Sequence, residues 1–279
     1  MQIFITGHRG QLGAALQRQA AATHQVSGGD HPEFDITNFA QVRDQLMAAR
    51  PQIVIHCAAF TNVDDAARQP TEAYRVNGLG TQNIALICAQ ADIPLVYLSS
   101  NEVFDGTQSE PYREFDPTNP ANPYGYSKLA GEWFTQKLLR RFYIVRTSWL
   151  TGSGGRNFVH RIQQLAAEGR LLKVVTDEVA CPTFVPDLIQ AILKLIETDH
   201  YGIYHFVNSG YCSRYDYARK ILELTGRQHI SLEPITLADY PRPSTPPKFS
   251  PLLNQCGAAL GITLPPWEEA LAEFLEQGR

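Results

Sequence analysis

The chain of 279 residues is long enough for one large domain or two unequal ones, and its 44% hydrophobic and 19% charged residues indicate a globular fold. A formal net charge of −4 gives no electrostatic reason to expect nucleic acid binding, and no run of about 18 apolar residues predicts a membrane span. Five scattered cysteines without a C-x-x-C motif, and a start without a basic leader, predict no disulfide framework, zinc site or signal peptide, so reduced thiols in a cytoplasmic protein are expected.

The predicted elements begin with a short apolar run at Gln2–Ile5, which is typical of a buried parallel strand. The run ends in a turn with the spacing G-x-x-G-x-x-G, and Gln11–Ala22 then has the pattern of a helix. In such a turn Gly7 permits the tight bend, Gly10 lets backbone N–H groups approach a pyrophosphate, and Gly13 allows helix and strand to pack closely. The turn predicts dinucleotide binding, with a plain turn as the alternative.

The second strand is expected at His24–Ser27, and a helix follows at Asn38–Arg50. In NAD-preferring proteins an acidic residue near the end of this strand holds the ribose hydroxyls and repels a 2′-phosphate. Here Asp30 comes slightly late, which argues against exclusive use of NAD. Arg9, inside the first loop, can meet a 2′-phosphate or can be an ordinary exposed arginine. We therefore expect NADPH as the cofactor and leave NADH open.

Small side chains follow the third expected strand, Ile53–Cys57. They belong to the segment Ala58–Asp64, and small residues at this edge of a parallel sheet suit a cofactor that lies across it. The long helical stretch Thr71–Ala91 comes next and carries Asn77. From its position alone, Asn77 can be a plain residue of the helix surface.

A hydroxyl and a tyrosine–lysine pair follow along the chain. Ser100 comes after the fourth expected strand, Leu95–Leu98, where a hydroxyl can bind a substrate carbonyl or satisfy a loop amide. The expected helix Pro123–Arg140 places Tyr124 and Lys128 one turn apart on one face. A neighbouring ammonium favours the phenolate and lowers the pKa of a tyrosine from roughly 10, so the pair is a candidate acid or base for carbonyl/alcohol interconversion. The same spacing is also common on ordinary amphipathic helices.

A fifth strand at Tyr143–Arg146 completes five alternations of strand and helix without a hairpin signal. The expected fold class is therefore α/β, with a Rossmann-type doubly wound parallel sheet and a smaller C-terminal substrate-binding α/β lobe. The elements expected after Ser148 are a flexible loop at Trp149–Gly155, helices at Arg156–Gly169 and Pro186–Glu197, strands at Leu172–Val175 and Ile203–Val207, and an ordered proline-rich loop at Asp239–Pro251. We expect residues 1–148, joined by roughly 172–200, to bind the dinucleotide, and residues 149–171 and 201–279 to form the substrate-binding lobe.

Taken together, these motifs resemble the extended short-chain dehydrogenase/reductase superfamily and, within it, the dTDP-4-dehydrorhamnose reductase family. The match runs through nearly the whole chain in the order of the family, which makes it specific where each motif alone is not. The segments that carry it are Thr6–Gly13, Ala58–Asp64, Val76–Asn77, Val103–Gly106, Tyr124–Glu132, Val145–Trp149, Gly155–Val159, Pro182–Leu188 and Gly202–His205. The family implies reduction of the C4 ketone of a nucleotide-activated 4-keto-6-deoxy sugar by NAD(P)H, first of all dTDP-4-dehydro-L-rhamnose to dTDP-L-rhamnose.

The resemblance also implies roles for matching residues. Tyr124 would give a proton to the ketone oxygen, Lys128 would hold the nicotinamide ribose and tune Tyr124, and Ser100 would orient the ketone; these three are the implied catalytic residues. The implied cofactor-binding residues are Gly7, Arg9, Gly10, Gln11, Leu12, Asp35, Ile36, Ala58, Ala59, Phe60, Thr61, Asn77, Tyr124 and Lys128. The implied substrate-binding residues are Ser100, Asn101, Glu102, Tyr124, Trp149, Asn157, Arg242 and Lys248. No metal is expected, and the oligomeric state is open, with a homodimer as one outcome.

Two departures from the family pattern fall on the substrate side. The family's Ser-Thr-Asp-Tyr-Val-Phe is Ser-Ser-Asn-Glu-Val-Phe here, so Asn101 lacks a carboxylate and Glu102 replaces an aromatic residue. The arginine of a late Arg-Pro-x-x-Ser stretch is missing, although Arg242 and Lys248 stand close in sequence. The alternatives are therefore a reductase or epimerase of another nucleotide sugar, and a non-catalytic NADP-binding regulatory subunit resembling that of methionine adenosyltransferase.

Overall fold

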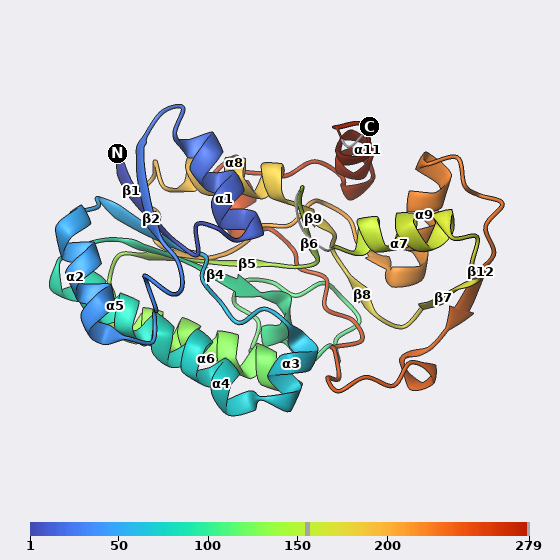
Figure 1. Ribbon diagram of the computed structural model, residues 1–279, viewed down its shortest axis with the longest axis horizontal. Coiled ribbons are helices and arrows are strands. Elements are labelled where there is room, and N and C mark those ends of the chain that lie inside the picture. The colour runs from blue at the N-terminus through green and yellow to red at the C-terminus, as the bar shows by residue number, and fades with distance from the viewer. Residues whose placement is uncertain (154–156, 278–279) are drawn as a thin grey trace.

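The computed structural model describes residues 1–153 and 157–277. The molecule is elongated, with a broad sheet between helices at one end and a smaller group of helices and short strands at the other (Figure 1). The sheet has the strand order β10-β5-β4-β3-β1-β2, and every neighbouring pair is parallel. Its strands are β1 (Gln2–Thr6), β2 (Gln25–Gly29), β3 (Ile53–His56), β4 (Leu95–Ser100), β5 (Phe142–Thr147) and β10 (Gly202–His205). This order, which runs outward from β1 in both directions, confirms the predicted Rossmann-type doubly wound sheet.

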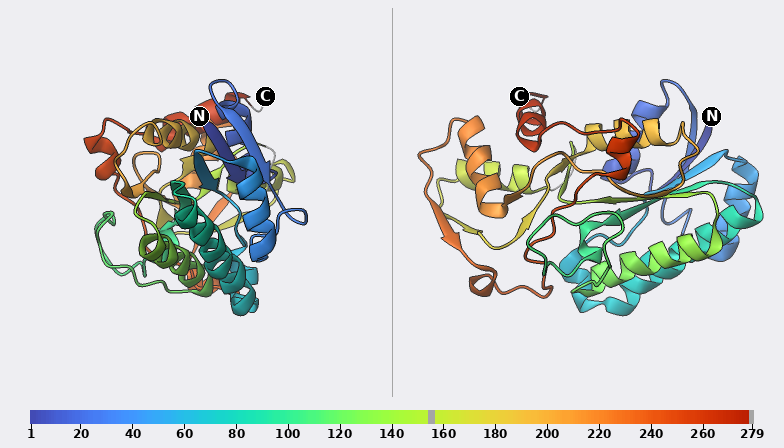
Figure 2. Two further views of the ribbon diagram at one scale, coloured as in Figure 1. Left: turned by 90° about the vertical axis from the view of Figure 1, so that its left-hand side faces the viewer. Right: turned by 180° about the vertical axis from the view of Figure 1, so that it is seen from behind.

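Helices cover both faces of the sheet, as the two further views also show (Figure 2). One face carries α1 (Gln11–Ala20) and α8 (Val185–Leu195), which pack against each other, while α2 (Phe39–Ala49), α5 (Thr81–Gln90) and α6 (Pro123–Leu138) lie on the other. The inner strands β1, β3, β4 and β5 are largely buried and mostly apolar because helices cover both faces of the sheet, whereas the edge strand β2 is partly exposed.

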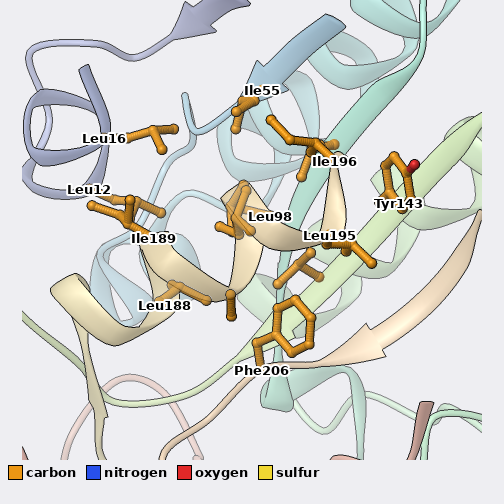
Figure 3. Packing of buried hydrophobic residues seen from close by; sticks show 14 of the residues in the cluster. Leu12, Leu16, Ile55, Leu98, Tyr143, Leu188, Ile189, Leu195, Ile196 and Phe206 are labelled. Atoms are coloured by element: carbon orange, nitrogen blue, oxygen red, sulfur yellow. The ribbon is translucent and has the colours of Figure 1, made fainter. Parts of the chain in front are cut away.

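The core between the sheet and the α1/α8 layer is built mostly from aliphatic side chains, together with aromatic ones such as Tyr143 and Phe206 (Figure 3). Leu16 of α1, Ile55 of β3 and Leu188 of α8 are fully buried there. Burial of each such side chain stabilises the fold by about 1.5–3 kcal/mol, before the cost of ordering it. This packing fixes the height at which the strands end, and therefore the positions of the residues that follow them.

Two strands end later than the sequence suggested. The strand expected at His24–Ser27 is β2, Gln25–Gly29, so Asp30 follows it directly and is not late. The strand expected at Leu95–Leu98 extends to Ser100, which pairs in register with Thr147 of β5. Pairing with neighbouring strands extends both strands beyond the apolar residues that marked them in the sequence.

The helix expected at Thr71–Ala91 is interrupted. The chain forms α3 (Val63–Arg68), α4 (Pro70–Tyr74), a π-helical segment η1 (Arg75–Gly80) and then α5. A π-helical turn inside a helix is rare and frequently lies at a functional site. It places Asn77 in the interior, where the residue is 1% exposed, so its reading as a plain surface residue is wrong.

The smaller group of elements, called the small lobe below, has its own core. It comprises α7 (Phe158–Ala167), α9 (Arg214–Leu224), α11 (Trp267–Gln277) and the strand pairs β6 (Leu150–Thr151) with β9 (Thr183–Phe184), β7 (Leu172–Val175) with β12 (Leu232–Ile235), and β8 (Val179–Ala180) with β11 (Cys212–Ser213). Its apolar cluster includes Val159, Tyr217 and Leu271. The expected loop at Trp149–Gly155 begins with β6, and its last two residues, like Arg156 of the next expected helix, lie outside the described residues. The division of the chain into two domains remains a prediction.

The proline-rich segment Asp239–Pro251 starts at the last residue of the short helix η3 (Leu237–Asp239) and is otherwise a loop without a helix or strand, as expected. Arg242 in it forms an ion pair with Asp64, and Ser250 accepts a hydrogen bond from the Asn101 amide. The segment therefore ties the loops at the sheet edge to the small lobe. The remaining elements are α10 (Cys256–Ala259) beside β10 and the 3-10 turn η2 (Asn101–Val103). No helix in the ranges 1–153 and 157–277 is long and apolar enough to cross a membrane.

Candidate active site

A cleft of about 1020 Å³ follows the carboxyl ends of β1, β3, β4 and β5. Its walls come from the glycine-rich turn, the segment after β3, the tip of β4, the first turns of α6 and the start of the small lobe. Doubly wound sheets bind ligands at this edge, because neighbouring loops diverge there. The cleft therefore lies where a dinucleotide would be held.

The glycine-rich turn fits a dinucleotide, because side chains on its glycines would fill the cradle. Gly7 has a φ of +68°, and a Cβ there would lie 2.7 Å from the backbone nitrogen of Ala58. A Cβ on Gly13 would lie 2.2 Å from the carbonyl oxygen of Gly7. Gly10 is the N-cap of α1 and offers no side-chain cap, so the first N–H groups of the helix stay available to a pyrophosphate.

The end of the cleft beside β2 carries both signs of charge. The Asp30 carboxylate accepts the Arg9 backbone N–H at 2.8 Å, and the Arg9 guanidinium forms an exposed ion pair with Glu33 at 3.3 Å. Burial acts to raise the pKa of Asp35, but hydrogen bonds from Thr37 outweigh it and the pKa is lowered. A cation for a 2′-phosphate and carboxylates for ribose hydroxyls are thus both present, so this end fits either nicotinamide cofactor.

The residues predicted to bind the cofactor gather along the cleft. Those that line it are Gly7, Arg9, Gly10, Gln11, Leu12, Asp35, Ile36, Ala58, Ala59, Phe60, Thr61, Tyr124 and Lys128. Asn77 does not line it. The Asn77 amide instead accepts the Phe60 N–H at 2.7 Å, and it donates to the Phe60 carbonyl at 3.0 Å and to the Ser127 hydroxyl at 2.9 Å. Asn77 therefore positions the backbone of a residue that faces the cleft, and its direct contact with the cofactor stays a prediction.

The tyrosine–lysine pair begins the helix that forms one wall of the cleft. Asn122 caps α6 by accepting the Gly125 N–H at 2.9 Å, and Pro123 occupies its first turn. This start puts Tyr124 and Lys128 into the cleft together with Ser100 at the tip of β4. The three predicted catalytic side chains therefore face the same space as the glycine-rich turn.

Close contact between α6 and the sheet explains how deep the pair lies. A Cβ on Gly131 would come within 2.3 Å of the Tyr97 hydroxyl, so only glycine permits this approach. The same hydroxyl donates to the Lys128 carbonyl at 3.0 Å, and the Lys128 ammonium lies 4.4 Å from the centre of the Tyr97 ring. Lys128 is 3% exposed as a result.

This burial shifts the pKa values of Tyr124 and Lys128. Burial, and then the negative charge of Glu102, raise the pKa of Tyr124 above its ordinary value of 10.0, while the Ser100 side chain acts to lower it. Burial also lowers the pKa of Lys128 to about 7, although the charge of Glu132 acts to raise it. Burial therefore acts against the predicted lowering of the Tyr124 pKa, because desolvation disfavours the phenolate.

The two residues that depart from the family pattern stand at the substrate side of the cleft. Asn101 donates to the Ser250 hydroxyl at 2.7 Å. The Glu102 carboxylate accepts the Asn122 amide at 2.5 Å, and burial raises its pKa to about 7. Both residues line the cleft, as predicted, so this chain presents an amide and a weakly acidic carboxyl there.

Trp149 also lines the cleft, where β5 leads into the small lobe. Its φ of +42° lies in the left-handed region, which costs roughly 1–2 kcal/mol in a residue other than glycine. Its ring stacks on Tyr217 with the centroids 6.2 Å apart. Packing of the indole against the small lobe therefore stabilises a backbone conformation of Trp149 that would be unfavourable by itself.

Three residues predicted to bind the substrate do not line the cleft. Asn157 caps α7 through the His160 N–H and donates its amide to the Gly152 carbonyl. Arg242 and Lys248 form ion pairs with aspartates, at 2.9 and 3.4 Å. The fold gives the three side chains structural partners, and substrate binding by them stays a prediction.

Sequence reasoning missed Arg214, the first residue of α9. Its guanidinium carbon lies 3.6 Å from the centre of the Trp149 ring, and the side chain lines the cleft. Arg75 of η1 was also missed; it lines the opposite end and pairs with Glu72. No local motif marks Arg214, which meets Trp149 only because α9 packs beside the end of β5.

The whole chain, residues 1–279, matches the family model described as RmlD substrate binding domain. A dTDP-4-dehydrorhamnose reductase of Mycolicibacterium smegmatis is 38% identical over 277 residues, covering 98% of this chain and 84% of the relative. The spore coat polysaccharide biosynthesis protein SpsK of Bacillus subtilis is 36% identical over 277 residues, covering 99% of this chain and 97% of the relative.

A crystal structure of dTDP-4-dehydrorhamnose reductase from Bacillus anthracis in complex with NADP superposes with a TM-score of 0.96 at 38% identity. The similarity covers 99% of both chains, so it includes the sheet, the cleft and the small lobe. The chain belongs to the RmlD substrate binding domain family, that of the dTDP-4-dehydrorhamnose reductases.

Proposed function

We propose that the protein is an oxidoreductase that reduces the C4 ketone of a nucleotide-activated 4-keto-6-deoxy sugar with NADPH, first of all dTDP-4-dehydro-L-rhamnose to dTDP-L-rhamnose. The observation that carries the proposal is that Ser100, Tyr124 and Lys128 line one cleft together with the glycine-rich turn. Relatives named dTDP-4-dehydrorhamnose reductase, and the complex of one of them with NADP, support both the reaction and the cofactor. NADH is the alternative cofactor.

NADPH bound in this cleft supplies the hydride, and the protein supplies binding, orientation and the proton. A phenol is protonated at neutral pH even at its ordinary pKa of 10.0, and the burial that raises the pKa of Tyr124 makes it a weaker acid, so proton transfer to the ketone oxygen depends on stabilisation of the phenolate. Ser100 orients that oxygen from the tip of β4. Lys128 holds the nicotinamide ribose, and its ammonium form stabilises the phenolate left after the proton is given.

Replacement of Tyr124 by phenylalanine tests the proposal. The variant keeps the ring and should bind NADPH nearly as the wild type does, while kcat falls by about 10²–10⁴-fold. The measurement is NADPH oxidation at 340 nm with dTDP-4-dehydrorhamnose, alongside NADPH titration by fluorescence. Turnover near that of the wild type would remove Tyr124 from the mechanism.

One alternative function competes with this proposal: the protein would be a reductase or epimerase that acts on another nucleotide sugar. Asn101 and Glu102 motivate it, because both departures from the family pattern line the substrate side of the cleft. A panel of dTDP-, UDP- and GDP-linked 4-keto sugars, followed by NADPH oxidation and by product stereochemistry, distinguishes the assignments. The homodimer, the cytoplasmic location and the division into two domains stay predictions.

A further inference from the structure

Arg214 is a cation that lines the cleft and has no part in the catalytic step proposed above. The arginines and lysines that line the cleft, within the part of the chain that the structure describes, are Arg9, Arg75, Lys128 and Arg214. Arg9 and Arg75 stand at the end beside β2 and η1, where each pairs with a glutamate. Lys128 sits beside Tyr124. Arg214 is therefore the guanidinium on the side of the small lobe.

The Arg214 side chain is held in place from three directions. Its Nε donates to the Glu178 carboxylate at 3.0 Å, and its guanidinium carbon lies 3.6 Å from the centre of the Trp149 ring and 5.0 Å from that of Phe158. The backbone N–H of Arg214 also donates to the Glu178 carbonyl at 3.1 Å. Because only the face and the Nε of the guanidinium are in contact with the protein, its two terminal nitrogens can donate hydrogen bonds to another partner.

Those terminal nitrogens form no hydrogen bond with any residue that the structure describes, and the side chain is 21% exposed. Planar, paired N–H donors match the oxygens of phosphate groups. A nucleotide-activated sugar whose ketone meets Ser100 and Tyr124 must place its diphosphate farther along the cleft. Arg242 and Lys248, which were predicted to bind the substrate, do not line the cleft.

We propose that Arg214 binds the diphosphate of the nucleotide-activated sugar and makes the enzyme specific for diphosphate-linked substrates. This inference rests on the proposed function, because it takes the substrate class from it. Glu178 and Trp149 act as positioning residues. They hold the guanidinium in the orientation that binds the diphosphate, so the Arg214 side chain loses less conformational entropy on binding.

The test compares Arg214→Met with Arg214→Lys and with the matched control Arg219→Met. Methionine keeps the apolar stem against Trp149 and removes the charge, while lysine keeps the charge without the paired donors. Arg219 lies on the same helix, and its 68% exposed side chain pairs with Asp216 away from the cleft. Thermal unfolding and NADPH titration of each variant establish that the fold and the cofactor site are retained.

The probes are dTDP and thymidine, with UDP and GDP included so that the identity of the base does not decide the result. Calorimetric titration in the presence of NADPH should show dTDP affinity about 10- to 100-fold weaker in Arg214→Met, intermediate in Arg214→Lys and unchanged in Arg219→Met. Thymidine, competed against dTDP, should bind Arg214→Met as it binds the wild type. The salt dependence of dTDP binding should also become shallower in Arg214→Met.

Two outcomes overturn this inference while leaving the proposed function intact. Arg214→Met that binds dTDP as the wild type does would show that the diphosphate lies elsewhere. Equal losses for dTDP and thymidine would show that Arg214 only supports the shape of the cleft. A wild-type protein that binds none of the nucleoside diphosphates and reduces no keto sugar would overturn the proposed function and this inference together.

Discussion

Replacement of Glu102 by glutamine should remove a pH-dependent penalty on stability. The folded chain raises the pKa of this carboxyl from 4.5 to about 7, chiefly by burial. The Asn122 hydrogen bond and the charges of Arg242 and Arg214 act to lower the pKa, while the charge of Glu178 acts to raise it. The protein therefore keeps the carboxyl protonated at pH values where the unfolded chain has already released the proton.

The sign and size of the effect follow from this difference. Between pH 4.5 and about pH 7 the folded state binds more protons than the unfolded state, so the stability contributed by Glu102 falls as the pH rises through this window. Each pH unit of the difference is worth about 1.4 kcal/mol, so the penalty approaches about 3 kcal/mol above pH 7. Glutamine is neutral at every pH and can still accept the hydrogen bond of Asn122.

Urea unfolding of the wild type and of Glu102→Gln at pH 4, 6 and 8 measures this penalty. The two proteins should have equal free energies of unfolding at pH 4, and the variant should be more stable by about 3 kcal/mol at pH 8. Glu110→Gln, at an exposed position, should follow the wild type throughout. A constant difference between Glu102→Gln and the wild type across the three pH values would refute the reasoning.

Two further substitutions test how the cleft is built. Gly131→Ala should lower stability by about 1–3 kcal/mol and reduce activity, because the new Cβ would meet the Tyr97 hydroxyl at 2.3 Å and push α6 from the sheet; an unchanged melting temperature would show that the contact relaxes freely. Asn77→Ala should cost about 1–3 kcal/mol and weaken NADPH binding, because it removes the side chain that pairs both part-buried backbone groups of Phe60. NADPH titration checks the second effect, and wild-type affinity in a destabilised variant would separate Asn77 from the cofactor site.

Residues that act through local spacing could be predicted from the sequence. The glycine-rich turn lies between a strand and a helix, and its glycines are explained by contacts within the turn and with the segment that follows β3. Tyr124 and Lys128 needed only the helix start at Asn122 and the helical period to be placed on one face. The partners of Asn157, Arg242 and Lys248 could not be predicted in this way, because a polar residue near a motif has several available partners and only the folded chain selects one.

The sequence by itself determined the parallel sheet, the turn that cradles a dinucleotide and the face that carries Tyr124 and Lys128. These depend on apolar runs, glycines and a four-residue spacing, all of which act over short stretches of chain. Only the tertiary structure decided that Arg214 lies over Trp149, that Asn77 is buried, and that burial raises the pKa of Tyr124. Desolvation and contacts between distant segments depend on which surfaces meet in space, and that information appears only once the whole chain is packed.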